Sequence, residues 1–286
     1  MLTTGVATVH ETERRVLVIT GGHPYDADTF FAMLDALPGI DWFHVAHPES
    51  LEWLTPERAD RYDVVVRYDM PGIRFTRADP PVELLDPPEE HVGAFGALLE
   101  RGTPMVFLHH AIAGWPRWDG FADVVGGRFH YQPAALRGRE WPDSGYRHDV
   151  RQTVRVVAPD HPICAGVPAA FEVVDEAYLC PIFEDDVVPL LRSGHRFEAD
   201  GFWSADLAIR GERDANDGWT HPPGSDLVGW VKHEGRSPIA YLQFGDGPSA
   251  HADANVRRLL ANTIGWAASD EARRWAVARA TSRSSG

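Results

Sequence analysis

The sequence has 286 residues, of which 44% are hydrophobic, enough to bury a sizeable core. It carries 27 Lys and Arg against 42 Asp and Glu, a formal net charge of −15, which disfavours nucleic acid or an anionic membrane surface as partner and favours a neutral or cationic small molecule. There are two cysteines, no apolar run long enough to span a bilayer and no charged-then-apolar leader, and together these features predict a cytoplasmic protein.

The first 130 residues alternate between predicted strands and predicted helices. The strands are expected at residues 15–20, 41–46, 62–68 and 105–108. Between them, apolar residues recur at helical spacing, as in Phe30, Met33, Leu34 and Leu37. This alternation predicts a doubly wound, mainly parallel sheet with helices on both faces and ligands bound at the carboxyl ends of the strands.

Short strands separated by Pro, Gly and Asp follow residue 133 and predict mixed or antiparallel additions to the sheet. They are expected at residues 151–158, 171–174, 187–191, 227–232 and 239–244. The polar segment 195–226 between them is either a mobile surface excursion or a lid. With a closing helix at 253–268, we expect a single domain over residues 15–268, and flexible termini at 1–14 and 281–286.

Two adjacent histidines follow the central apolar strand at residues 105–108. This strand lacks the alternation of a half-exposed strand, so both of its faces are expected to be covered. Neighbouring side chains point to opposite sides of a strand, so only one of His109 and His110 should reach the cleft. We favour His110, because the turn towards Gly114 begins there, and expect the other to be structural.

Two further histidines lie where turns could bring them to the same cleft. His23 follows Gly21 and Gly22 at the end of the first strand, in a turn that lacks the pattern of a dinucleotide-binding or phosphate-binding loop. His130 follows the glycine turn at 126–127. For each, a functional role and a plain structural role remain open alternatives.

The acidic stretch at 171–186 contains the main carboxylate candidates. Asp175 and Glu176 follow an apolar pair and precede Tyr178, so one of them is expected at a strand end facing the cleft. A carboxylate near imidazoles could orient a histidine, act as a general base or share a divalent metal with them. Asp246 and His251, after the strand at 239–244, are further candidates of the same kind.

Taken in order, several of these motifs resemble the ThuA-like (trehalose utilisation) family over residues 15–268. They are Gly21-Gly22-His23, the strand ending in His109-His110, Gly126 to His130, Asp175 to Tyr178, and Leu242 to Gly247 with the closing helix. The resemblance implies a flavodoxin-like fold similar to class I glutamine amidotransferases, and a role in sugar catabolism.

Two departures limit what the resemblance implies. A glutamine amidotransferase would have a cysteine at the turn after the central strand, where this chain has His-His-Ala-Ile-Ala-Gly at 109–114, so glutaminase activity is not expected. Many ThuA-like chains have Gly-His where this one has Gly245-Asp246, so the function of that histidine is absent here or has passed to His251.

The function expected from these features is that of a carbohydrate-metabolism enzyme acting on a sugar or an oxidised (keto) sugar derivative. His23, His110 and Glu176 are the expected catalytic residues, and the same three would hold Zn²⁺ or Mn²⁺ if the chemistry is metal-assisted. Substrate contacts are assigned to His109, Trp115, His130, Tyr178, Asp246 and His251. The alternative is a non-catalytic sugar-binding or regulatory protein, and a homo-oligomer is compatible with either.

Overall fold

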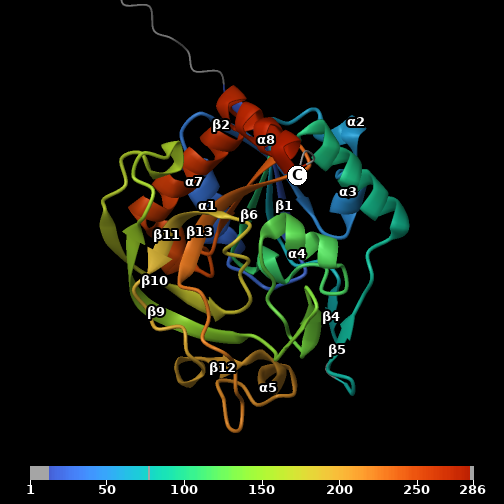
Figure 1. Ribbon diagram of the computed structural model, residues 1–286, viewed down its shortest axis with the longest axis vertical. Coiled ribbons are helices and arrows are strands. Elements are labelled where there is room, and N and C mark those ends of the chain that lie inside the picture. Colours follow the sequence, from blue (N-terminus) through green and yellow to red (C-terminus); the bar gives the residue numbers. More distant parts are fainter. Residues whose placement is uncertain (1–12, 77, 284–286) are drawn as a thin grey trace, which may run out of the picture.

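The computed structural model describes residues 13–283 apart from residue 77, and its centre is a ten-stranded sheet (Figure 1). The strands lie in the order β10-β9-β11-β13-β14-β6-β3-β1-β2, and β12 pairs with β9. Most of the terminal segments predicted to be flexible lie outside the described residues.

One half of the sheet is parallel, as the alternation of strands and helices predicts. It consists of β2 (Ile40–Ala46), β1 (Arg14–Gly21), β3 (Val64–Asp69), β6 (Met105–Leu108) and β14 (Ser237–Leu242). Successive residues of these strands enter opposite cores: Val16 and Val18 contact one hydrophobic cluster, and Leu17 and Ile19 the other. Burial on both faces explains why the strands read as continuous apolar runs.

The other half is antiparallel and extends the sheet beyond β14. It consists of β13 (Leu227–Glu234), β11 (Val188–Ser193), β9 (Gly145–Val156), β10 (Ala170–Leu179) and the short β12 (Trp203–Ser204). The additions predicted after residue 133 are therefore confirmed as antiparallel strands.

Helices cover both faces of the sheet (Figure 1). One face is covered by α1 (Ala27–Asp35), α7 (Ala254–Ala267) and α8 (Asp270–Arg283), and the other by α2 (Pro56–Ala59), α3 (Glu89–Arg101) and α4 (Asp119–Val125). The helix α8 was not predicted, and it includes residues 281–283 of the expected flexible tail. No helix in the described part of the chain combines the length and the hydropathy that crossing a bilayer requires.

The remaining elements are short, and several of them lie at one end of the sheet. The helices are α5 (Ala205–Ile209) and α6 (Pro248–Ala252), and the 3₁₀ helices are η1 (Glu49–Glu52), η2 (His109–Ala113), η3 (Pro162–Cys164) and η4 (Ala199–Gly201). Two hairpins are formed by β4 (Ile73–Phe75) with β5 (Val82–Leu84), and by β7 (Ala134–Leu136) with β8 (Arg139–Trp141). Figure 1 shows β12, α5 and the β4–β5 hairpin together at the lower end of the molecule.

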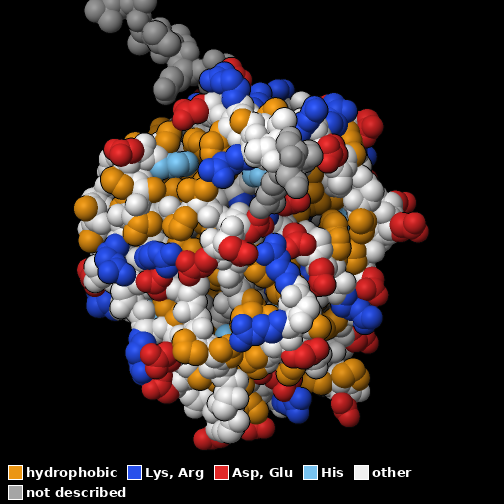
Figure 2. Space-filling view, viewed as in Figure 1, with side chains coloured by type: hydrophobic (Ala, Val, Ile, Leu, Met, Phe, Trp, Pro, Cys, Tyr) orange, Lys and Arg blue, Asp and Glu red, His pale blue; other side chains and the backbone are white. Residues whose placement is uncertain are grey.

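Acidic and basic side chains are interspersed over the face drawn in Figure 2, and neither sign gathers into a single patch there. The net charge of −15 is therefore not concentrated on this face.

Candidate active site

The two adjacent histidines lie at the carboxyl end of β6, where the strand turns directly into η2. His109 has a φ of +48°, a left-handed conformation that is uncommon for a residue with a side chain. Because the backbone leaves the strand here, the alternation of side chains no longer applies, and the His109 and His110 rings lie 5.6 Å apart. Both histidines are buried at the same end of the sheet; of the two, His110 lines the cavity described below, and His109 contacts Glu176, which lines it.

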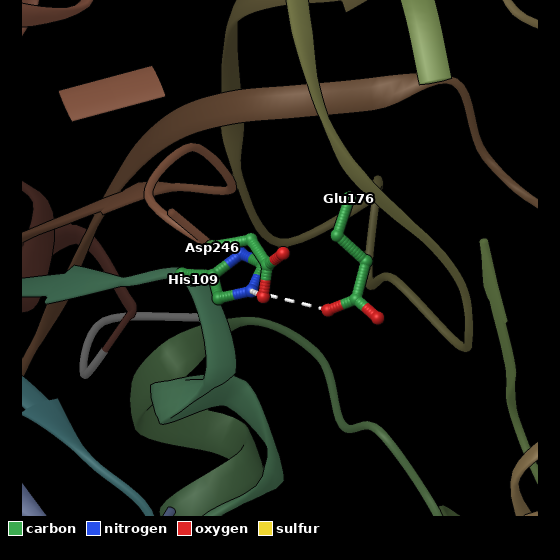
Figure 3. A group of neighbouring side chains, drawn as sticks. All are labelled: His109, Glu176 and Asp246. Atoms are coloured by element: carbon green, nitrogen blue, oxygen red, sulfur yellow. Dashed lines mark ion pairs between the residues drawn. The ribbon is translucent and has the colours of Figure 1, made fainter. Parts of the chain in front are cut away.

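His109 is the centre of a buried hydrogen-bond network (Figure 3). Its Nδ1–H donates to the backbone carbonyl of Gln243 at 2.7 Å, which directs Nε2 towards oxygen atoms. Nε2 lies 2.7 Å from the Tyr178 hydroxyl and 3.2 Å from Oε2 of Glu176. Burial alone would lower the pKa of His109, but hydrogen bonds to Asp246 and Glu176 outweigh burial and raise the pKa well above its usual value.

A β-bulge between β9 and β10 directs Glu176 and His148 to the same place. Asp175 pairs with Val150 and Ala177 with Arg147, so His148 and Asp149 together lie opposite Glu176. Asp149 has a φ of +54°. Nδ1 of His148 lies 3.1 Å from Oε1 of Glu176, so the two oxygens of this carboxylate contact two different imidazoles.

Asp175 is buried and fixes the loop that carries Asp246. Its carboxylate accepts hydrogen bonds from three backbone N–H groups, those of Gly245 at 2.8 Å, Asp246 at 3.0 Å and Glu176 at 3.0 Å. Burial raises its pKa to about 6, although the His109 charge and these donors oppose the shift. Asp175 therefore supports the site from behind, whereas Glu176 faces it.

His23 and His110 form a second imidazole pair, with ring centroids 4.8 Å apart in a stacked arrangement. Nδ1–H of His23 donates to the Pro24 carbonyl at 2.7 Å, which leaves Nε2 without a proton in the neutral ring. Nε2–H of His110 donates to the Tyr68 carbonyl at 3.0 Å. Burial lowers the pKa of both rings, so this pair is neutral beside the cationic His109.

Glycine is required beside His23. Gly22 has a φ of +80°, and a Cβ at this position would overlap the backbone carbonyl of Met70. The close approach of these two turns places His23 over the end of the sheet.

A cavity of about 330 Å³ lies at this end of the sheet. Its residues divide into a polar group and a largely apolar and aromatic group. The polar group is His23, His110, His148, Glu176 and Arg213, and the other is Phe75, Pro81, Ala113, Phe129, Tyr131, Tyr146, Tyr178, Ala205, Ala208 and Ile209. Of the predicted substrate contacts, Tyr178 lines this cavity. His109 and Asp246 do not line it: Nε2 of His109 lies 3.2 Å from Oε2 of the lining residue Glu176, and Oδ1 of Asp246 lies 3.5 Å from the same Nε2.

Two further predicted substrate contacts, Trp115 and His130, lie away from the cavity. Trp115 is buried against the His47 and His91 rings, because the chain has turned away from the sheet end by the close of η2. His130 is also buried elsewhere, and burial, together with the Arg128 charge, lowers its pKa to about 4. These positions correct the expectation that the glycine turn at 126–127 returns His130 to the cleft.

His251 supports the backbone of the site and does not face substrate. Its Nδ1 lies 2.8 Å from the Thr29 hydroxyl, and its Nε2 lies 3.1 Å from the carbonyl of Gly245. With both ring nitrogens bound within the protein, His251 does not replace a histidine at position 246.

Sequence reasoning did not identify His148, Arg213 or α5 as parts of the site. The first half of β9 was missed because the polar residues 147–149 interrupt its pattern. The recurrence of Tyr146 and His148 with a period of two was the available signal. The structure places part of the segment 195–226 in the wall of the cavity, through α5 and Arg213.

A metal could be held in the described part of the chain by His109, Glu176 and Asp246, whose ligand atoms lie within 4.8 Å of one another. This group differs from the predicted set, since His109 and Asp246 take the places of His110 and His23. The Nδ1–H bond to Gln243 orients His109 as in many metal-binding histidines, so the donor set fits Zn²⁺ or Mn²⁺. A cation would have to displace the Nε2 proton that now pairs with the two carboxylates.

The family model described as ThuA, trehalose utilisation, matches residues 15–267. The chain belongs to the ThuA family. Two solved ThuA-like proteins share its fold across almost the whole chain. The protein from Parabacteroides merdae is 14% identical, with 90% of this chain and 91% of that chain covered and a TM-score of 0.63. The protein from Bacteroides uniformis is 18% identical, with coverage of 93% and 95% and a TM-score of 0.60.

The fold of this ThuA family member is also that of class I glutamine amidotransferase-like proteins. The structure of PurLQS from Thermotoga maritima is 10% identical, with 89% of this chain and 99% of that chain covered and a TM-score of 0.50. The predicted fold class is thus confirmed. A comparison with curated proteins finds no significant sequence match.

Proposed function

We propose that this protein is a cytoplasmic enzyme that transfers protons on a sugar or a keto sugar, as an isomerase, lyase or hydrolase of carbohydrate metabolism. The observation that carries the proposal is the neutral imidazole of His23 facing the same cavity as Glu176, a carboxylate paired with a cationic His109. The environments of His23 and His109 drive the pKa values of these two imidazoles in opposite directions, a pattern typical of acid–base sites.

In this mechanism His23 is the base, because its Nε2 carries no proton and faces the cavity. It would take a proton from a carbon next to a carbonyl, while negative charge develops on the carbonyl oxygen. Stacking on His110 keeps the His23 ring in place. The cationic His109 stabilises the developing charge from behind Glu176, and the Glu176–His148 pair supplies a proton to the product.

Glutaminase activity is not part of this proposal, because His109 occupies the turn where an amidotransferase has its cysteine. Neither of the two cysteines of the chain lines the cavity. Burial raises the pKa of Cys164 to about 11 and that of Cys180 to about 12, which disfavours the reactive thiolate in both.

The direct test is hydrogen exchange in D₂O. Glucose, trehalose and keto derivatives of glucosides are incubated with the protein, and deuterium incorporation next to the carbonyl is followed by NMR. The wild type should catalyse exchange in at least one keto sugar. His23→Asn and Glu176→Gln should each lower the rate by about 100-fold or more, because each removes a proton-transfer group.

The matched control is His161→Asn, because His161 lies outside the cavity and asparagine can replace it as the cap of η3. Exchange should survive dialysis against a chelator. If exchange is lost on chelation and recovers when Zn²⁺ or Mn²⁺ is added, the reaction is metal-assisted, and acid–base catalysis without a metal is refuted. Binding without exchange in any sugar would contradict catalysis and favour the non-catalytic sugar-binding alternative.

A further inference from the structure

The hydroxyl groups of the three tyrosines that line the cavity are already bound within the protein, so a ligand meets their rings and not free hydroxyl groups. The Tyr131 hydroxyl contacts Sδ of Met70 at 3.6 Å, and the Tyr178 hydroxyl lies 2.7 Å from Nε2 of His109. The Tyr146 hydroxyl donates to Asp214 at 3.2 Å and accepts from its backbone N–H at 3.0 Å.

The other residues of this region are apolar and come from three separate parts of the chain. Phe75 belongs to the β4–β5 hairpin, Phe129 follows α4, and Ala208 and Ile209 belong to α5. The Phe75 ring is 43% exposed and meets Tyr131 edge to face at 5.5 Å. The hairpin and α5 are therefore two walls that present an apolar surface to whatever enters.

This surface does not suit a second sugar ring. Each sugar hydroxyl that leaves water needs a hydrogen-bond partner, and a buried polar group without one costs about 1 to 3 kcal/mol. The cavity has five polar side chains: His23, His110, His148 and Glu176 belong to the catalytic group, which leaves Arg213 alone to bind the hydroxyl groups of a second ring. Aromatic and aliphatic side chains instead favour stacking and burial of an apolar group.

We propose that the substrate is a glycoside with an aromatic or similarly apolar aglycone, bound with its sugar ring at His23 and Glu176 and its aglycone between Phe75, Tyr131 and Ile209. The placement of the sugar ring rests on the proposed function, whereas the placement of the apolar aglycone rests only on the residues of the cavity wall. A disaccharide is disfavoured, because its second ring would lie against bound tyrosine hydroxyls and alkyl groups.

The test compares the binding of methyl glucoside, phenyl glucoside and trehalose by isothermal titration calorimetry. Each sugar is used in its parent form and in its keto form, and the two glucosides are used as both anomers. The best phenyl glucoside should bind at least about 10-fold more tightly than the matching methyl glucoside and than trehalose. Equal or tighter binding of trehalose, or no measurable binding of any phenyl glucoside, would overturn the proposal.

A wall variant locates the preference. Ile209→Asn should reduce the phenyl-over-methyl preference several-fold and leave methyl glucoside binding nearly unchanged. The matched control is Val157→Asn, an exposed position outside the cavity, which should leave the preference intact. Binding can be measured without turnover, so the two proposals can fail separately. A preference for phenyl glucoside without deuterium exchange would refute only the catalytic proposal. Deuterium exchange without that preference would refute only the proposal of an apolar aglycone.

Discussion

Asp175 shows how a residue that does not face substrate can determine the geometry of the site. Its three backbone hydrogen bonds hold the 245–246 turn against β10, and this turn carries Asp246 to within 3.5 Å of His109. Burial is the largest influence on the pKa of this carboxyl group and raises it, while the charge of His109 lowers the pKa and that of Asp246 raises it.

A pH dependence of stability follows from the raised pKa of Asp175. Its pKa rises from 3.8 to about 6 on folding, so between these values the folded protein holds a proton that the unfolded chain has lost. The contribution of Asp175 to stability is therefore complete below about pH 4 and falls as the pH rises through 6. Between pH 4 and 7 the wild type should lose about 1 to 3 kcal/mol relative to Asp175→Asn, measured by urea unfolding.

The control for this prediction is Glu172→Gln, which removes an exposed carboxyl group from the same strand. Its unfolding free energy should run parallel to that of the wild type over this pH range. If the unfolding free energy of Asp175→Asn also runs parallel to that of the wild type, the Asp175 carboxyl group is ionised over the whole pH range, and the hydrogen bonds from the backbone outweigh the effect of burial.

At the residue scale, the sequence located the carboxylates and imidazoles but not their orientations. The motif at 175–178 predicted a strand-end carboxylate, and the structure separates it into a supporting Asp175 and a cavity-facing Glu176. The positive φ of His109 and the bulge at Asp149 decide which side chains converge. Neither leaves a clear local signal, because most His and Asp residues have a negative φ even though both types are enriched among the few that do not.

At the scale of elements, one buried carboxylate holds α5 in the wall of the cavity. Asp143 accepts from the Ser204 hydroxyl at 2.6 Å and from the Asp206 backbone N–H at 2.9 Å, both at the start of α5. It also accepts from Nε1 of Trp219 at 2.9 Å. A segment that reads as a polar loop is thus anchored at both ends by a distant side chain.

Asp143→Ala should loosen this wall of the cavity. Three donors lose their acceptor, which should cost about 1 to 3 kcal/mol, and the amides of 203–219 should exchange with deuterium faster than in the wild type. Hydrogen-exchange mass spectrometry checks this directly. Asp123→Ala is the control, since Asp123 forms an exposed ion pair with Arg137 and should change stability by less than about 1 kcal/mol. Unchanged protection over 203–219 would contradict the anchoring role.

Most elements of the parallel half were predictable, because strands buried on both faces and amphipathic helices have strong patterns. The helix α8 was not, since its residues lack an apolar stripe and only small side chains such as Ala272 and Ala276 are buried. The start of β9 and the short α5 depend on tertiary contacts, and these cannot be read from local sequence.

At the scale of the whole molecule, the parallel and antiparallel halves share their cores. One cluster includes Val16 of β1 with Val154 of β9, and the other includes Ile19 of β1 with Tyr146 of β9. Differential scanning calorimetry should therefore record a single transition with equal calorimetric and van't Hoff enthalpies. Asp143→Ala, in the antiparallel half, should shift this transition as one. Two separate transitions would contradict the single domain.

The bulge between β9 and β10 also limits how this chain can change in length. Before it, the even-numbered Tyr146 lies in the same hydrophobic cluster as the cavity residue Tyr178, and after it the even-numbered Val150 and Val154 lie in the opposite core. Removing Asp149 would restore strict alternation, so either the aliphatic side chains or the site residues would point to the wrong side. Hairpins and loops around the cavity can accommodate insertions and deletions. At Asp149, in contrast, the gain or loss of one residue would turn side chains of the core towards the active site and side chains of the site towards the core.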